Sequence, residues 1–244
     1  MTDMTKDNLT VISGSILAGA LIVAGSIIYA FGPDGATPNV VTTTTNTLPA
    51  FETKVPYQQT LGEGGDIILG NPGAKVKIVE YGDYQCPYCE KFFKESEGEI
   101  RRQYVANGKA NMIYKDLIVI DNFIPNGQES HNAALAANCA ADQGKFWEYH
   151  DALFTVEGLD GKENNGNLIK SLFMAIAEKL KLDKKQFENC YDTGKYSSEV
   201  ISDTAEASKD LARLSTPSTL INGEVISGAV PFSDFVAVID KYLK

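Results

Sequence analysis

Two closely spaced cysteines are the residues in this sequence best suited to carry out chemistry. Cys86 and Cys89 stand in a Cys-Pro-Tyr-Cys segment, with Pro87 and Tyr88 between them. A C-x-x-C spacing at the junction of a strand and a helix is typical of a redox dithiol rather than of a metal site. Unpaired N–H groups and the helix dipole stabilise an anion at the start of a helix. We therefore expect Cys86 to have a lowered pKa and to react as a thiolate.

The segments on either side of this motif supply the strand and the helix that the chemistry needs. Residues 76–81 form an apolar, β-branched run that predicts a strand. Residues 90–107 predict a helix, and Gly108 is suited to end it. This order places Cys86 at the beginning of the helix. Cys89 lies one turn further on, where its thiol can close a disulfide with Cys86.

Further strands and helices follow this β–α unit along the chain. Residues 111–120 become rich in β-branched side chains and predict a second strand. Asn222 and Gly223 suit a type I′ turn. They predict a hairpin between residues 218–221 and 224–227. Residues 66–72 are a short apolar stretch that ends in a turn, and the other elements that we expect are a block of helices from about residue 125 to 212 and a last helix at residues 233–243.

Size and charge limit the class of protein. The chain has 244 residues, 43% of them apolar, which is enough for one ordinary domain with an appendage or for two small domains. The net charge of −10 argues against nucleic acid as the main partner, because phosphate binding needs a basic face.

An uncharged apolar segment near the N-terminus predicts a membrane anchor. Residues 9–31 carry no charge over 23 positions, which is long enough to cross a bilayer as a helix. The segment is longer than the apolar region of a typical cleaved signal, and no clean cleavage site follows it. Lys6 precedes it and no basic residue follows until Lys54, so we expect residues 1–8 in the cytoplasm and the bulk of the chain outside. A cleaved signal, which would leave a secreted or periplasmic protein, stays the alternative.

The region after the predicted anchor divides into a linker and a folded domain. Residues 32–60 combine several prolines with a run of threonines and show no helical or strand period. Such a composition predicts an extended, flexible linker. We expect the folded domain over residues 61–244, with the helical block inserted within it.

The order of these elements resembles the thioredoxin fold carrying a helical insertion, an α/β class. More narrowly, the chain resembles the DsbA-like thiol–disulfide oxidoreductases of bacteria, in their membrane-anchored branch. The resemblance covers roughly residues 66–243. The segments that carry it are Leu-Gly-Asn-Pro at 69–72, Val-Glu-Tyr at 79–81 leading to Gln-Cys-Pro-Tyr-Cys at 85–89, Gln-Gly-Lys-Phe-Trp-Glu-Tyr-His-Asp at 143–151, Ser-Thr-Pro-Ser at 215–218, and Ile-Asn-Gly at 221–223 with Gly-Ala at 228–229.

The resemblance implies an enzyme that exchanges disulfides with extracytoplasmic client proteins through Cys86 and Cys89. It favours an oxidase, with a quinone-linked membrane protein as the partner that re-oxidises the pair, and it implies no cofactor. The intervening Pro87 and Tyr88 lack the histidine of the most oxidising members, which argues against a very high reduction potential. Two alternatives stay open: a reductase or isomerase of the same fold, and a membrane-tethered protein that binds metal through the two cysteines.

Thr216 and Pro217 are the residues that the resemblance assigns to client binding. It implies a cis bond between them that lies against the redox motif and exposes the backbone of Thr216 to an extended client peptide. Without the resemblance, the interpretation would be a trans proline that opens an edge strand.

Glu80 lies six positions before Cys86 in an apolar strand. A buried carboxyl has a raised pKa and could relay a proton to or from Cys89. The resembled family places an acidic residue here, which favours this role. Strand alternation alone does not decide depth, so a carboxylate that reaches solvent stays the alternative.

Cys139 and Cys190 are the other two of the four cysteines. Because the close pair accounts for one pairing, they are left to form a structural disulfide, which implies an oxidising compartment. Such a bridge would add about 4 kcal/mol by chain entropy. Two buried free thiols are the alternative reading.

The remaining polar candidates give weaker signals. Two histidines, His131 and His150, could in principle join the cysteine pair around zinc. No second pair of ligands has finger-like spacing, so we expect no metal site and interpret both as ordinary helix residues. Lys115 and Asp116 predict a solvated ion pair at the end of a strand.

Overall fold

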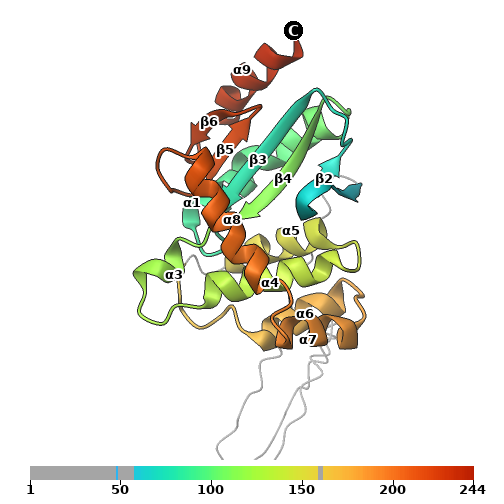
Figure 1. Ribbon diagram of the computed structural model, residues 1–244, viewed down its shortest axis with the longest axis vertical. Helices are drawn as coiled ribbons and strands as arrows, with labels where there is room; N and C mark the ends of the chain where they lie inside the picture. Colours follow the sequence, from blue (N-terminus) through green and yellow to red (C-terminus); the bar gives the residue numbers. More distant parts are fainter. Residues whose placement is uncertain (1–47, 49–57, 159–161) are drawn as a thin grey trace, which may run out of the picture. The chain divides into compact units, whose positions relative to one another are not determined.

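The computed structural model describes residues 48, 58–158 and 162–244. Six strands in this part of the chain form one mixed sheet of order β1-β2-β4-β3-β5-β6 (Figure 1). The two central strands, β3 and β4, run parallel, and every other neighbouring pair is antiparallel. The strands are β1 (Gln59–Leu61), β2 (Ile67–Gly70), β3 (Val76–Gly82), β4 (Ala110–Asp116), β5 (Ser218–Ile221) and β6 (Glu224–Ser227).

The helices of the described residues fall into four groups along the chain. A continuous helical segment at 87–105, in which α-helical and π-helical turns alternate, connects β3 to β4. Its parts are α1 (Pro87–Phe92), η2 (Phe93–Glu97), α2 (Gly98–Ile100) and η3 (Arg101–Val105). The others are a short 3₁₀ turn η1 (Glu63–Gly65), the inserted helices α3 (Ile120–Phe123), α4 (Glu129–Ala141), α5 (Phe146–Glu157), α6 (Lys170–Lys179), α7 (Lys184–Asp192) and α8 (Ser197–Asp210), and the final helix α9 (Phe232–Leu243).

The two faces of the sheet are covered by different helices, and β3 shows which side chains go where. Val76 and Ile78 belong to the main apolar core with residues of the 87–105 helix and of α9. Val79 and Tyr81 belong to a smaller cluster with residues of α8. Because side chains of a strand alternate between faces, Glu80 points to the same side as Ile78, toward the helix that carries the cysteines.

The helical block sits between β4 and β5 in the chain, and Figure 1 shows it at one end of the sheet. Helix α4 is at its centre and packs against α5, α6, α7 and α8. A disulfide joins Cys139 of α4 to Cys190 of α7, with a Sγ–Sγ distance of 1.98 Å. This is the pairing that the sequence predicts, so the alternative of two free thiols is wrong.

Two predicted boundaries are corrected by long-range contacts. The strand predicted over residues 111–120 ends at Asp116, and the chain turns into α3. The cause lies outside the segment, because the Asp83 carboxylate accepts hydrogen bonds from the N–H groups of Val119 and Ile120, both at 2.9 Å. The linker predicted up to residue 60 is also too long, because Gln59 and Thr60 belong to β1 and pair with β2.

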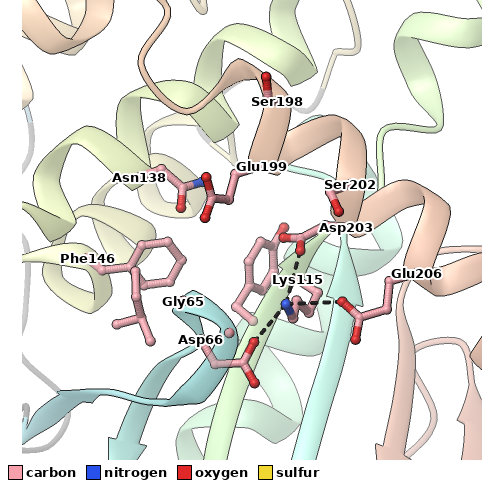
Figure 2. A pocket seen from close by; sticks show the side chains of 13 residues that line it. Gly65, Asp66, Lys115, Asn138, Phe146, Ser198, Glu199, Ser202, Asp203 and Glu206 are labelled. Carbon is pink, nitrogen blue, oxygen red and sulfur yellow. Dashed lines mark hydrogen bonds and ion pairs between the residues drawn. The ribbon is translucent and has the colours of Figure 1, made fainter.

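The interpretation of Lys115 and Asp116 as a solvated pair is wrong. The Lys115 side chain is 12% exposed, and its Nζ atom lies 2.7 Å from Asp66, 3.0 Å from Asp203 and 3.3 Å from Glu206. Figure 2 shows these contacts in the wall of a cleft of about 360 Å³ between β4, the start of β2 and α8. The ion pairs fasten α8 to the sheet, and the residues lining this cleft do not include the cysteine motif.

Asp116 is buried beside this ion-pair cluster. Its carboxylate accepts a hydrogen bond from the Asn138 side chain at 2.9 Å. Burial, followed by the nearby charge of Asp203, raises its pKa well above the ordinary value. Asp116 is therefore a core residue that ties β4 to α4.

Among the helices of the described residues, we find none with the length and apolar character needed to cross a bilayer. The predicted cytoplasmic segment at 1–8 and the predicted anchor at 9–31 lie outside the described residues. The linker predicted over 32–60 overlaps them at residue 48 and at residues 58–60.

Candidate active site

Cys86 and Cys89 stand where the sequence predicts, at the junction of a strand and a helix. β3 ends at Gly82, and Cys86 directly precedes α1, whose first residue is Pro87. The backbone of Cys86 is extended, and its carbonyl accepts the N–H of Glu90 at 3.0 Å, which closes the first helical turn. Both cysteines are free thiols, with Cys86 5% exposed and Cys89 fully buried.

The environment of Cys86 stabilises its thiolate. Its pKa is lowered to about 6, first because the Cys89 thiol donates a hydrogen bond to it. Burial opposes this effect, while the Thr216 side chain and the N–H groups of Cys89 and Tyr88 add further hydrogen bonds. These N–H groups belong to the first helical turn, which we expected to stabilise the thiolate. The hydrogen bond from Cys89, which we did not expect, lowers the pKa of Cys86 more than they do.

Cys89 is held in the opposite protonation state. Burial raises its pKa well above the ordinary value, and the hydrogen bond to Cys86, the charge of Cys86 and the charge of Glu80 raise it further. The N–H of Asp83 lies 3.5 Å from its sulfur. The pair therefore consists of one thiolate and one thiol near neutral pH, and only the thiolate is a nucleophile.

Thr216 and Pro217 lie against this pair. The peptide bond between them is cis, which confirms the expectation drawn from the resemblance. They directly precede β5, whose first residue Ser218 is paired with Tyr81 near the end of β3. The Thr216 carbonyl oxygen lies 3.5 Å from the Cys86 sulfur. Sheet pairing thus brings two residues from the C-terminal part of the chain to the redox motif.

Glu80 is fully buried, so the alternative of a carboxylate reaching solvent is wrong. Neither of its carboxyl oxygens has a hydrogen-bond partner among the described residues. Burial raises its pKa well above the ordinary value, and the charge of Glu97 adds to this more than Arg101 offsets it. Burial and the charge of Glu97 therefore favour the protonated form of Glu80, which lies on the face of β3 covered by the helix that carries the cysteines.

Gln85 is a site residue to which sequence reasoning gave no role of its own. Its side-chain Nε2 donates to Asp121 at 3.0 Å and to Ser130 at 2.8 Å, and its Oε1 accepts the N–H of Asn164 at 2.5 Å. The three partners come from α3, α4 and the loop before α6. The residue before Cys86 is thus fixed to the helical insertion from three directions. A polar residue beside the motif was the available signal in the sequence.

A buried ion-pair cluster behind the cysteines was also missed. Glu97 forms an ion pair with Arg101 one turn later, and Arg101 donates to Asp151 of α5 at 2.8 Å. The Nε2 atom of His150 lies 3.4 Å from the Glu97 carboxylate. Glu97 and Arg101 have the i,i+4 spacing of a helical ion pair, which was the available signal. Their burial and their partners in α5 could not be anticipated.

The two histidines do not lie beside the cysteines as a shared set of ligands. His150 is fully buried, and its Nδ1 atom lies 3.3 Å from the Tyr84 hydroxyl. It is therefore a core residue with a polar contact to Tyr84, whereas we expected an ordinary helix residue. His131 contacts the Ser197 hydroxyl at 3.3 Å. In the described part of the chain, no cluster of three or more His, Cys, Asp or Glu residues is arranged to hold a metal ion.

The chain is similar to known proteins in sequence and in structure. A family model described as thioredoxin matches residues 63–241. Disulfide bond formation protein D of Bacillus subtilis (strain 168) is 28% identical over 189 residues, covering 74% of this chain and 78% of that protein. The probable disulfide bond formation protein D of Bacillus anthracis is 28% identical over 226 residues, covering 92% and 91%. The crystal structure of oxidised BdbD from Bacillus subtilis has a TM-score of 0.62 at 24% identity, covering 78% of this chain and 97% of that one.

Proposed function

This chain belongs to the thioredoxin family, and we propose that it is a protein-disulfide oxidoreductase that forms disulfides in client proteins through Cys86 and Cys89. The observation that carries the proposal is the asymmetry of the pair. Cys86 has a pKa lowered to about 6, whereas Cys89 is buried with a raised pKa. The names of the two Bacillus relatives refer to disulfide bond formation, which supports the oxidising direction.

The exchange proceeds in two displacements at sulfur. In the oxidised protein, a client thiolate attacks the Cys86 sulfur, so that a client–Cys86 disulfide forms and the Cys86–Cys89 bond breaks. The electron pair of the broken bond goes to Cys89, which takes up a proton. A second client thiolate then attacks the client sulfur of the mixed disulfide, and Cys86 leaves as a thiolate. The client loses two electrons and the cysteine pair gains them, and the low pKa of Cys86 makes it a good leaving group.

Glu80 is the proposed proton donor to Cys89. The sulfur of Cys89 is buried, so an anion formed there during exchange would be strongly disfavoured. Glu80 is buried on the same side of the sheet, and its raised pKa favours the protonated form. We propose that it gives this proton to Cys89 as the mixed disulfide forms and recovers it after the client has left.

Client binding is assigned to Thr216 and Pro217. The backbone of Thr216 lies beside the Cys86 sulfur, where an extended client segment could pair with it as an added strand. Tyr88, which is 63% exposed between the two cysteines, offers apolar surface to the same segment. Pairing through the backbone would let the enzyme accept clients of unrelated sequence.

We propose that this catalytic domain works outside the cytoplasm, tethered by a single span at residues 9–31. The apolar, uncharged character of that segment supports the tether. The disulfide between Cys139 and Cys190 supports an oxidising compartment. A quinone-linked membrane protein would then be a suitable partner to re-oxidise Cys86 and Cys89. A secreted or periplasmic form after signal cleavage is the alternative that N-terminal sequencing of the mature protein would reveal.

The experiment that tests the function uses a reduced, unfolded client whose native state contains disulfides. Oxidised protein should transfer its disulfide to this client, measured as loss of client thiols and appearance of the reduced Cys86–Cys89 pair. Equilibration of the pair with glutathione then gives the direction of exchange. A pair that remains oxidised under strongly reducing glutathione would favour the reductase or isomerase reading. Failure to transfer a disulfide to any client would contradict the proposal.

A further inference from the structure

A cluster of buried charges lies between the helix that carries the cysteines and α5 of the helical insertion. The Arg101 guanidinium bonds to the Glu97 carboxylate and, at 2.8 Å, to the Asp151 carboxylate. His150 lies 3.4 Å from the same oxygen of Glu97. The side chains of all four are at most 4% exposed. The Trp147 ring covers the guanidinium, with its centre 4.6 Å from the Arg101 carbon.

Even without Glu80, this cluster holds two carboxylates against a single guanidinium. Charges in a low-dielectric interior must be paired, because an isolated buried ion is strongly disfavoured. Arg101 is paired with both carboxylates, and it and His150 outweigh burial to hold the pKa of Glu97 well below its ordinary value. An ionised Glu80 would be a third carboxylate competing for one guanidinium.

Glu80 faces this cluster from β3, on the side of the sheet that the 87–105 helix covers. Its two oxygens have no hydrogen-bond partner among the described residues, so nothing else there stabilises its anion. The titratable groups that interact with it come from the helix, from the loop after β3 and from β4. They are Cys86, Cys89, Glu97, Arg101, Tyr84 and Tyr114.

We propose that Glu97 is a positioning residue for the proton donor: by occupying Arg101, it keeps Glu80 in the neutral form that can protonate Cys89. This inference rests on the proposed function and deepens it. In this role Glu97 contacts neither the redox cysteines nor the client, and it acts through Arg101 and Glu80. Asp151 and His150 belong to α5, so the helical insertion supplies two of the groups that contact Arg101 and Glu97.

The substitution Glu97→Gln separates this role from simple packing. The glutamine keeps the shape of the side chain but releases one side of Arg101. Glu80 should then ionise toward the guanidinium and place a negative charge near both cysteines. A like charge disfavours a thiolate, so the pKa of Cys86 should rise by about 1. The same substitution at Glu99, an exposed helix residue that pairs with Arg102, is the matched control and should change nothing.

Two readouts on the full chain follow the proton itself. Infrared spectra at pH 7 should show the C=O stretch of a protonated acid in the wild type that is missing in Glu80→Gln and in Glu97→Gln. Other buried acids such as Asp116 are present in all three proteins and cancel in the difference. The pKa of Cys86, followed by thiolate absorbance of the reduced protein, should rise in Glu97→Gln. In a Glu80→Gln background, adding Glu97→Gln should leave it unchanged.

Three outcomes would overturn the inference while leaving the proposed function intact. The first is that the wild type and Glu80→Gln show the same protonated-acid bands, so that no band belongs to Glu80. This comparison does not depend on whether Glu97→Gln folds. Another is a Glu97→Gln protein in which the band persists. The last is an equal rise of the Cys86 pKa with and without Glu80, which would show that Glu97 acts on the cysteine directly. Conversely, loss of disulfide transfer in the wild type would contradict the function and not this charge arrangement.

Discussion

The two cysteine pairs of this chain are both buried but differ in their chemical state. Cys86 and Cys89 are free thiols, whereas Cys139 and Cys190 form a disulfide. The exposed fraction does not distinguish the two pairs, because all four cysteine side chains are at most 5% exposed. The pairs differ in the spacing of their cysteines along the chain and in their position within a helix. The redox pair is three residues apart at the start of a helix, and the bonded pair is 51 residues apart within α4 and α7.

This difference explains why one pair can exchange electrons and the other holds the fold. At a helix start, N–H groups are free to stabilise a thiolate, and here the Cys89 thiol adds a hydrogen bond. Inside a helix, the N–H groups are used by the helix itself, so a thiolate at Cys139 or Cys190 would gain no such support. A bond that closes a long loop removes much entropy from the unfolded chain, whereas one across three residues removes little.

The largest effect is expected from breaking the redox pair. Cys86→Ser should abolish disulfide transfer to a reduced client, because Cys86 is the cysteine whose pKa is lowered and the one exposed enough to react. Transfer is measured as loss of client thiols over time. The matched variant Cys139→Ser with Cys190→Ser should keep transfer at temperatures where it is folded. Substantial activity in Cys86→Ser would remove the basis of the comparison.

The reverse contrast should appear in stability. Replacing Cys139 and Cys190 by alanine should lower the free energy of unfolding by about 4 kcal/mol, since their bond closes a loop of about 50 residues. Replacing Cys86 and Cys89 by alanine should cost far less. Denaturant unfolding of both variants measures this. Equal losses would mean that the two pairs do not differ in their structural role.

The pH dependence of alkylation sharpens the electrostatic half of the comparison. The reaction of reduced protein with a thiol reagent should titrate with a midpoint near pH 6, compared with about 8.5 for free cysteine. Because folding lowers this pKa, the thiolate stabilises the reduced fold fully above about pH 8.5. The contribution is lost as the pH falls through about 6. Cys89→Ala should move the midpoint upward, since it removes the main hydrogen-bond donor, and an unchanged midpoint would contradict this assignment.

The smallest expected effect concerns the hydrogen bonds of Gln85, which connect the residue before Cys86 to the helical insertion. Gln85→Met should destabilise the protein by about 2 kcal/mol, because the buried Asp121, Ser130 and Asn164 groups lose their partner. The exposed Gln186→Met is the control and should stay within about 0.5 kcal/mol of wild type. Thermal or urea unfolding distinguishes them. A Gln85→Met protein as stable as the control would show that this contact does not anchor the loop.

Much of the fold could be read from local patterns. The β–α unit around the cysteines, the hairpin turn at Asn222 and Gly223 and the final helix all follow from residue types within a few positions. The predicted strand at 111–120 was too long because the N–H groups of Val119 and Ile120 bond to Asp83, more than 30 positions earlier. β-Branched residues favour a strand, but a side chain from elsewhere decided where this one ends.

The site was predicted in the same uneven way. The cysteine motif, Glu80, Thr216 and Pro217 were identified by position, whereas the depth of Glu80 could not be decided from strand alternation. Gln85 carried no signal of its own. Lys115 was interpreted as solvated because Asp66, Asp203 and Glu206, which surround it, are far from it in the chain. Where partners are distant, composition near a residue says little about its surroundings.

The sequence by itself determined which residues carry the chemistry, because the spacing of Cys86 and Cys89 and their place before a helix are local properties. Tertiary structure alone decided what surrounds that pair and, with it, the raised pKa of Glu80. The burial of Glu80 and the ion pair of Arg101 with Asp151 arise where β3, the cysteine helix and α5 meet. A pKa depends on burial and on every nearby charge, and those are fixed by which distant segments come together.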